Sequence, residues 1–145
     1  RTMDCVDCHN RPSHRFAPSP ERAVDAALTN GLLPRELPFL RREAVGALTE
    51  SYPDRASAEA GLERRLRAFY AGVPAGATPA LVDRAVAGVQ RIYAHNVFPA
   101  MRVTWGTHPN HLGHTDSPGC FRCHDEAHQA PDGRTISQDC TLCHK

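Results

Sequence analysis

Apolar residues recur every three or four positions through the middle of the chain, which is the spacing of one face of an α-helix. Three such stripes predict helices with one buried face each. β-branched residues are scattered and never alternate with polar ones over a useful length, so little or no β-structure is expected. The stripes consist of Leu37, Leu40, Ala44 and Leu48, then Ala58, Leu62, Leu66 and Phe69, then Val82, Ala85, Val86, Val89 and Ile92.

Capping residues and prolines set the expected ends of four helices. The first starts after Ser19 with Pro20 at its first position, and it stops at Gly31. Glu63 and Arg67 lie one turn apart on the polar side of the third helix, where they are expected to pair. The four expected ranges are about 20–30, 36–50, 54–72 and 78–98.

All six cysteines fall into three CxxCH motifs in the segments on either side of these helices. Two thiols at this spacing can add across the two vinyl groups of one haem, and the adjacent imidazole then reaches the iron from the same side. We therefore expect three haem c groups, with the six cysteines as attachment sites and one proximal histidine in each motif. The motifs are Cys5-Val6-Asp7-Cys8-His9, Cys120-Phe121-Arg122-Cys123-His124 and Cys140-Thr141-Leu142-Cys143-His144.

Six further histidines offer a second axial ligand to each iron. His14 and His128 follow the proximal histidines of their own motifs too closely to cross to the far face of the same haem, so each is expected to ligate a neighbouring haem. At least one of His111 and His114 should be an axial ligand, and the sequence does not decide between them. The lower-ranked candidates are His95, expected on the surface at a helix end, His108, which precedes Pro109, and the thioether of Met101.

Zinc is the main alternative to haem, because Cys120 to Cys143 also has the C-x2-C-x16-C-x2-C spacing of a tetracysteine ribbon. A ribbon gives no reason for a histidine directly after each second cysteine, and it leaves Cys5 and Cys8 without partners. Disulfides or a thioredoxin-like role are disfavoured because no βαβ pattern surrounds the motifs. The pattern therefore favours haem.

Length and composition fit a single haem-cored domain over residues 1–145. Its expected parts are a first haem segment (1–17), a helical scaffold (18–100) and a second and third haem segment (101–145). Only nine residues are Phe, Trp or Tyr, so porphyrins are expected to fill much of the core. The net charge of +1 gives no reason to expect a nucleic acid partner. Because Cys5 lies so near Arg1, we expect a domain of a longer multihaem chain.

The three motifs, with the stretches from Cys5 to His14 and from Trp105 to His128, resemble the multihaem c-type cytochromes of respiratory bacteria. These include NapC/NirT-like proteins and small triheme cytochromes of metal-reducing organisms. The resemblance covers roughly a third of the chain. It implies a periplasmic protein, with or without a membrane tether outside this segment. Implied partners are other redox proteins, such as cytochromes and quinol-linked or terminal reductases. The helical insert between the first and second motifs departs from compact triheme cytochromes.

Three functions compete for this arrangement. In an electron carrier, each of the three irons would be six-coordinate, with two imidazole ligands and no exchangeable position. Such ligation gives a low reduction potential compared with a His/Met pair. A reductase or a haem-based sensor instead needs one exchangeable axial position. Multihaem nitrite reductases commonly use CxxCK for that haem, whereas every motif here ends in histidine and Lys145 is the only lysine. The sequence therefore favours a carrier that is not an enzyme.

Covalent loading is tested by the intact mass of the protein under denaturing conditions. The mass should exceed that of the polypeptide by three haems, and Cys120→Ser combined with Cys123→Ser should remove one of them. A colourless, zinc-containing protein would end the cytochrome interpretation.

Overall fold

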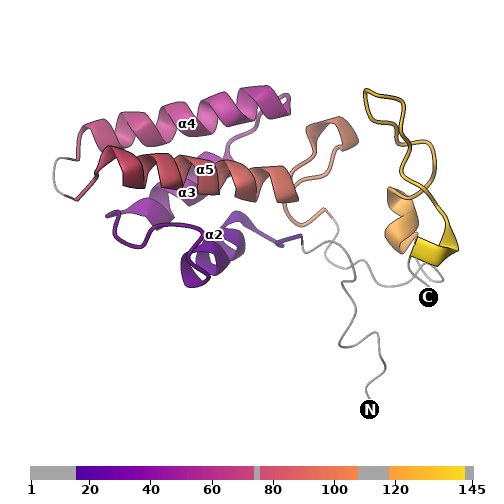
Figure 1. Ribbon diagram of the computed structural model, residues 1–145, viewed down its shortest axis with the longest axis horizontal. Coiled ribbons are helices and arrows are strands. Elements are labelled where there is room, and N and C mark those ends of the chain that lie inside the picture. The colour runs from indigo at the N-terminus through magenta and orange to yellow at the C-terminus, as the bar shows by residue number, and fades with distance from the viewer. Residues whose placement is uncertain (1–15, 74–75, 108–117, 143–145) are drawn as a thin grey trace, which may run out of the picture. The chain divides into compact units, whose positions relative to one another are not determined.

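A computed structural model describes residues 16–73, 76–107 and 118–142. The chain divides into two compact units, one formed by residues 16–108 and one formed by residues 1–15 with 109–145. We call them the helical unit and the motif unit (Figure 1). All three CxxCH motifs fall in the motif unit. The expectation that haems join the whole chain into one domain stays a prediction.

The helical unit contains the four α-helices expected from the sequence (Figure 1). They are α2 (Pro20–Thr29), α3 (Leu40–Thr49), α4 (Arg55–Ala71) and α5 (Pro79–Asn96). Within the described residues there is no strand, only two isolated bridges that pair Phe98 with Val103 and Gln129 with Thr135. The prediction of a mainly α fold is confirmed.

Three of these helices begin at the expected capping residues. Ser19 accepts a hydrogen bond from the backbone N–H of Arg22 at 3.4 Å, and Pro20 takes the first helical position of α2. The Asp54 carboxylate caps α4, and the Thr78 hydroxyl caps α5. These side chains supply acceptors for backbone N–H groups that have no partner inside a helix.

The predicted start of the second helix was wrong, because this helix, α3, begins at Leu40 rather than near residue 36. Pro38 disfavours helical backbone at the preceding Leu37, and Phe39 adopts a left-handed conformation with φ 63°. Leu37 is nevertheless buried, with 4% of its surface exposed, so its apolar character serves the core from outside the helix.

The buried faces follow the predicted stripes, with one correction on α4. Phe69 is only half-buried, and the neighbouring Tyr70 takes the core position instead, with 5% of its surface exposed. The Tyr70 hydroxyl donates to the carbonyl of Pro38 at 3.0 Å, which satisfies its polar end. The prediction chose the wrong ring because positions 69 and 70, three and four residues after Leu66, both match the helical spacing.

Helix α5 contacts each of the other three helices and lies alongside α4 (Figure 1). The expected pair of Glu63 and Arg67 forms at 2.7 Å, and Arg67 also reaches Asp83 of α5 at 2.7 Å. These exposed pairs add little to stability, so burial of apolar side chains is the main force that joins the helices. No helix of the described part has the length and apolar character to cross a membrane.

Two tyrosines, the half-buried Tyr52 and the buried Tyr70, are anchored by their hydroxyl groups. The Tyr52 hydroxyl lies 3.2 Å from the carbonyl of Ala47 and 3.0 Å from Oε2 of Glu50. Burial, and then the hydrogen bond to Glu50, raises the pKa of Tyr52 to about 12. Burial also raises the pKa of Tyr70 to about 12, with the negative charge of Glu43 adding to the effect.

Gly88 provides a test of the packing between α5 and the segment after α2. A Cβ at this position would lie 2.6 Å from Cδ2 of the fully buried Leu33 and 3.1 Å from the carbonyl oxygen of Leu32. Gly88→Ala should therefore lower the free energy of unfolding by about 1 kcal/mol, because overpacking outweighs the gain in helix propensity. The measurement is urea denaturation followed by far-UV circular dichroism.

Gly72→Ala is the matched control, because a Cβ there would lie 3.6 Å from the nearest atom, the carbonyl oxygen of Phe69. Its φ of −92° is open to any residue. A change within about 0.5 kcal/mol is expected. Equal destabilisation by both variants would contradict the close approach at Gly88.

The raised pKa values of Tyr52 and Tyr70 predict a loss of stability at alkaline pH. The fold holds both phenols neutral, whereas the unfolded chain ionises them near pH 10. Their contribution is therefore complete below pH 10 and lost as the pH rises from about 10 to about 12. Titration by ¹³C NMR of the tyrosine Cζ atoms checks this, with Tyr52→Phe to assign the signals. Titration of either residue near pH 10 in the folded protein would disagree with the structure.

Candidate haem-attachment site

Five of the predicted site residues lie in the described part of the motif unit: Cys120, Cys123, His124, His128 and Cys140. The other eight predicted site residues lie outside the described residues: Cys5, Cys8, His9, His14, His111, His114, Cys143 and His144. The lower-ranked candidate His108 lies outside them as well. The described site residues thus belong to the second motif, to the segment that follows it and to the beginning of the third motif.

The second motif forms a single 3-10 turn, Gly119–Arg122, with Cys123 as its C-cap. Gly119 has φ 51°, a conformation that glycine adopts without a Cβ clash, and it leads the chain into the turn. The backbone N–H groups of Cys123 and His124 both donate to the carbonyl of Cys120, at 3.2 Å and 3.0 Å. Cys120 thus lies in the turn and Cys123 caps it, and a backbone hydrogen bond joins the two cysteines.

The ring of His124 is oriented by a residue thirteen positions later. Its Nδ1 lies 2.7 Å from the backbone carbonyl oxygen of Ser137. Because a carbonyl oxygen can only accept, Nδ1 carries the proton and donates it, and Nε2 keeps a lone pair. This is the tautomer that a metal-ligating histidine needs, and an orienting hydrogen bond from its other nitrogen is typical of such ligands.

His128 is oriented in the same way, but its partner is a carboxylate. Its Nδ1 lies 2.9 Å from Oδ1 of Asp125, and the same oxygen accepts the backbone N–H groups of Ala127 at 2.9 Å and His128 at 3.0 Å. The hydrogen bond from the imidazole, and then that from the His128 backbone, lowers the pKa of Asp125 to about 2. With Nδ1 engaged, Nε2 of His128 is the nitrogen left to bind a metal.

A hairpin-like loop between the second and third motifs brings these partners into place. The backbone N–H of Glu126 donates to the carbonyl of Ile136 at 3.1 Å, and the backbone N–H of Ile136 donates to the carbonyl of His128 at 3.0 Å. Farther along, the N–H of Ala130 donates to Arg134 at 2.8 Å. Pro131-Asp132-Gly133 forms the turn at its tip, a composition that favours turns and that the sequence reasoning did not use.

The third motif starts on another 3-10 turn, Cys140–Leu142. Oδ1 of Asp139 accepts from both the backbone N–H and the hydroxyl of Thr141 at 2.8 Å, and these hydrogen bonds lower the pKa of Asp139. Cys140 is exposed, and Leu142 keeps 56% of its surface exposed. Leu142 thus presents apolar surface to solvent within the third motif.

The residues present fit haem c. The second motif offers one cysteine in a 3-10 turn and a second as its cap, followed by an imidazole whose Nδ1 is engaged and whose Nε2 would bind iron. Burial raises the pKa of the Cys123 thiol. Among the described residues, no three His, Cys, Asp or Glu side chains form a metal-binding group. The tetracysteine zinc alternative stays untested, because Cys143 lies outside the described residues.

Two lower-ranked ligand candidates lie in the helical unit. His95 sits exposed in the last turn of α5, with Nδ1 2.8 Å from the carbonyl of Arg91, so its expected place on the surface at a helix end is confirmed. Met101 is half-buried in the short 3-10 turn Pro99–Met101. Whether either residue ligates iron stays a prediction.

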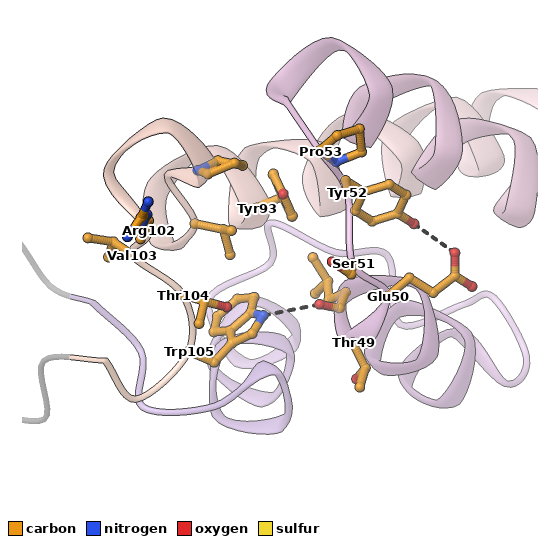
Figure 2. Close-up of a pocket in the computed structure, with 13 residues that line it drawn as sticks. Thr49, Glu50, Ser51, Tyr52, Pro53, Tyr93, Arg102, Val103, Thr104 and Trp105 are labelled. Carbon is orange, nitrogen blue, oxygen red and sulfur yellow. Dashed lines mark hydrogen bonds between the residues drawn. The ribbon is translucent and has the colours of Figure 1, made fainter.

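The helical unit also contains a pocket of about 410 Å³ where the α3–α4 turn meets the end of α5 and the segment after it (Figure 2). Tyr52, Tyr93 and Trp105 contribute aromatic surface. The Trp105 indole N–H donates to the carbonyl of Leu48 at 3.1 Å, and the Tyr52 hydroxyl is bound to Glu50, as Figure 2 shows. The Trp105 hydrogen bond joins the segment after α5 to α3, and the Tyr52 hydrogen bond lies within the α3–α4 turn. No predicted site residue lines the pocket.

Comparison with known proteins gives one informative match. No family model and no solved structure matches the chain. The chain is 45% identical over its whole length to the cytochrome c-type protein ImcH of Geobacter sulfurreducens, and it spans 29% of that protein's length. The chain is therefore similar, over its whole length, to part of a cytochrome c-type protein.

Proposed function

We propose that this chain transfers electrons through three covalently attached haem c groups, each with two histidine ligands. The main support is the second motif, in which a cysteine pair on one turn is followed by a histidine held in the tautomer that leaves Nε2 for iron. The placement of all six cysteines in CxxCH motifs extends this interpretation to three sites. The similarity to a cytochrome c-type protein agrees with it.

The bound group would supply a one-electron iron couple, and the protein residues would hold and tune it. Cys120 and Cys123 would fix the group through two thioether bonds. His124 would ligate iron through Nε2 while the carbonyl of Ser137 keeps its ring in one orientation. The first motif and the third motif are assigned the same roles from their sequences, with His9 and His144 as proximal ligands.

The distal ligands in this proposal are His14, His128 and at least one of His111 and His114. Support is strongest for His128, whose Nδ1 is bound to Asp125 and whose Nε2 is therefore the ligating nitrogen. Two imidazoles at every iron leave no position for a substrate. We therefore propose a carrier rather than a reductase or sensor.

The proposed partners are other redox proteins, including cytochromes and quinol-linked or terminal reductases. Transient docking through small interfaces suits electron exchange. The proposed location is the bacterial periplasm, where CxxCH thiols meet an oxidising environment. A tether to the membrane would lie outside this segment. The charges of 17 basic and 16 acidic residues nearly cancel, so long-range steering by net charge has no part in this proposal.

Carbon monoxide binding to the reduced protein tests whether the irons are closed. The unmodified protein should show little spectral change, because every axial position is occupied. His14→Ala and His128→Ala should each convert one iron to a high-spin form that binds carbon monoxide, as should at least one of His111→Ala and His114→Ala. His95→Ala is the control and should leave all irons low-spin.

Two outcomes would contradict the proposal in different ways. Stoichiometric carbon monoxide binding by the unmodified protein would identify an exchangeable position and favour a reductase or sensor. Unchanged low-spin spectra for both His14→Ala and His128→Ala would overturn the ligand assignment and point to His95, His108 or Met101.

A further inference from the structure

We propose that Asp125 is a positioning residue that orients the imidazole of His128 and lowers the reduction potential of the haem that His128 ligates. This inference rests on the proposed function, in which His128 is an axial ligand. Neither the motif pattern nor the similarity to another cytochrome assigns a role to Asp125. The evidence is the set of hydrogen bonds that converge on one of its carboxylate oxygens.

Asp125 restrains His128 both along the backbone and at the ring. Oδ1 accepts the backbone N–H groups of Ala127 and His128, so the turn that carries His128 is closed by the carboxylate itself. The same oxygen lies 2.9 Å from Nδ1 of His128. One atom therefore sets both the path of the chain and the direction of the ring, and Nε2 points away from the carboxylate.

The next residue strengthens this geometry. Glu126 adopts a left-handed conformation with φ 60°, and its N–H donates to the carbonyl of Ile136 at 3.1 Å. Non-glycine residues adopt such backbone only at an energetic cost, so the surrounding hydrogen bonds must hold it. The turn from Asp125 to His128 is therefore fixed from both sides.

The two described histidines of the motif unit, His124 and His128, differ in the charge of their partners. His124 donates to a neutral carbonyl, whereas His128 donates to a carboxylate. A negatively charged acceptor makes the stronger hydrogen bond and gives the ring more imidazolate character, which makes Nε2 a stronger electron donor. A stronger donor stabilises ferric over ferrous iron, so the haem that takes His128 should have a lower potential than the same haem without the carboxylate.

Asp125→Asn separates this role from a purely structural one. The amide oxygen of asparagine still accepts the two backbone N–H groups, so the turn should persist, but the imidazole then donates to a neutral acceptor. Asp132→Asn is the matched control, because Asp132 lies in the same loop and pairs with Arg134 at 2.8 Å rather than with a histidine. It removes the same charge from the same segment.

The experiment compares haem midpoint potentials, measured by spectroelectrochemical titration, in the unmodified protein, Asp125→Asn, Asp132→Asn and Asp125→Glu. Asp125→Asn should favour reduction of one haem by about tenfold in its equilibrium constant, which is about 59 mV for one electron. Asp132→Asn should shift every haem by much less. Asp125→Glu keeps the charge and should recover part of the difference.

The electron paramagnetic resonance spectrum gives a second readout. In Asp125→Asn the low-spin signal of one ferric haem should change its g values while all irons stay six-coordinate. Equal potential shifts in Asp125→Asn and Asp132→Asn, with unchanged g values, would overturn the role of Asp125.

His128→Ala distinguishes that failure from failure of the proposed function. If His128→Ala opens an iron to carbon monoxide and Asp125→Asn changes neither potential nor g values, only the tuning role is wrong. If His128→Ala leaves every iron closed, the ligand assignment fails and the inference fails with it.

Discussion

The hydrogen bond from Nδ1 of His124 to the carbonyl of Ser137 is the interaction on which the described motif segment depends. It joins the second haem-attachment motif to the residues that lead into the third, across the hairpin-like loop between them. An imidazole ligates a metal with one nitrogen only if the proton sits on the other. The distant backbone carbonyl therefore decides what the motif can do chemically, although it forms no part of the motif.

The helical unit and the described motif segment are stabilised in different ways. Helices α2 to α5 bury a continuous apolar cluster, and side chains such as Leu33, Leu62 and Val89 are completely covered. Between residues 118 and 142, Gly119 is the one buried residue. The conformation of this segment is instead stabilised by turns and by side chains that accept backbone N–H groups. A segment of this kind gains little from the hydrophobic effect on its own, so a covalently bound apolar cofactor would complete its packing.

Much of the fold could be predicted because its signals are local. Ser19, Asp54 and Thr78 precede helices for a reason contained within the next four residues, and the structure has each as a cap. The exceptions depend on distant neighbours. Positions 69 and 70 both match the helical spacing from Leu66, and it is Tyr70 that enters the core, where the carbonyl of Pro38, 32 positions away, accepts its hydroxyl.

The same distinction holds at the candidate site. The CxxCH spacing points to Cys120, Cys123 and His124 because porphyrin dimensions determine it. Asp125 and Ser137 were missed, although Asp125 had a local signal, since an aspartate three residues before a histidine can close a turn on it. Ser137 had no such signal, because it acts through its backbone carbonyl and any residue there could supply the same atom.

In the hairpin-like loop, different residues determine the number of positions between the motifs and the orientation of the two histidine rings. The groups that hold His124 and His128 lie at the base of this loop, whereas Pro131, Asp132 and Gly133 form its exposed tip. Extra residues at such a tip cost little, since closure entropy grows only slowly with loop length. Spacing between haem motifs can therefore drift in evolution while the imidazole geometry is retained, and a register shift at the base would be the damaging change.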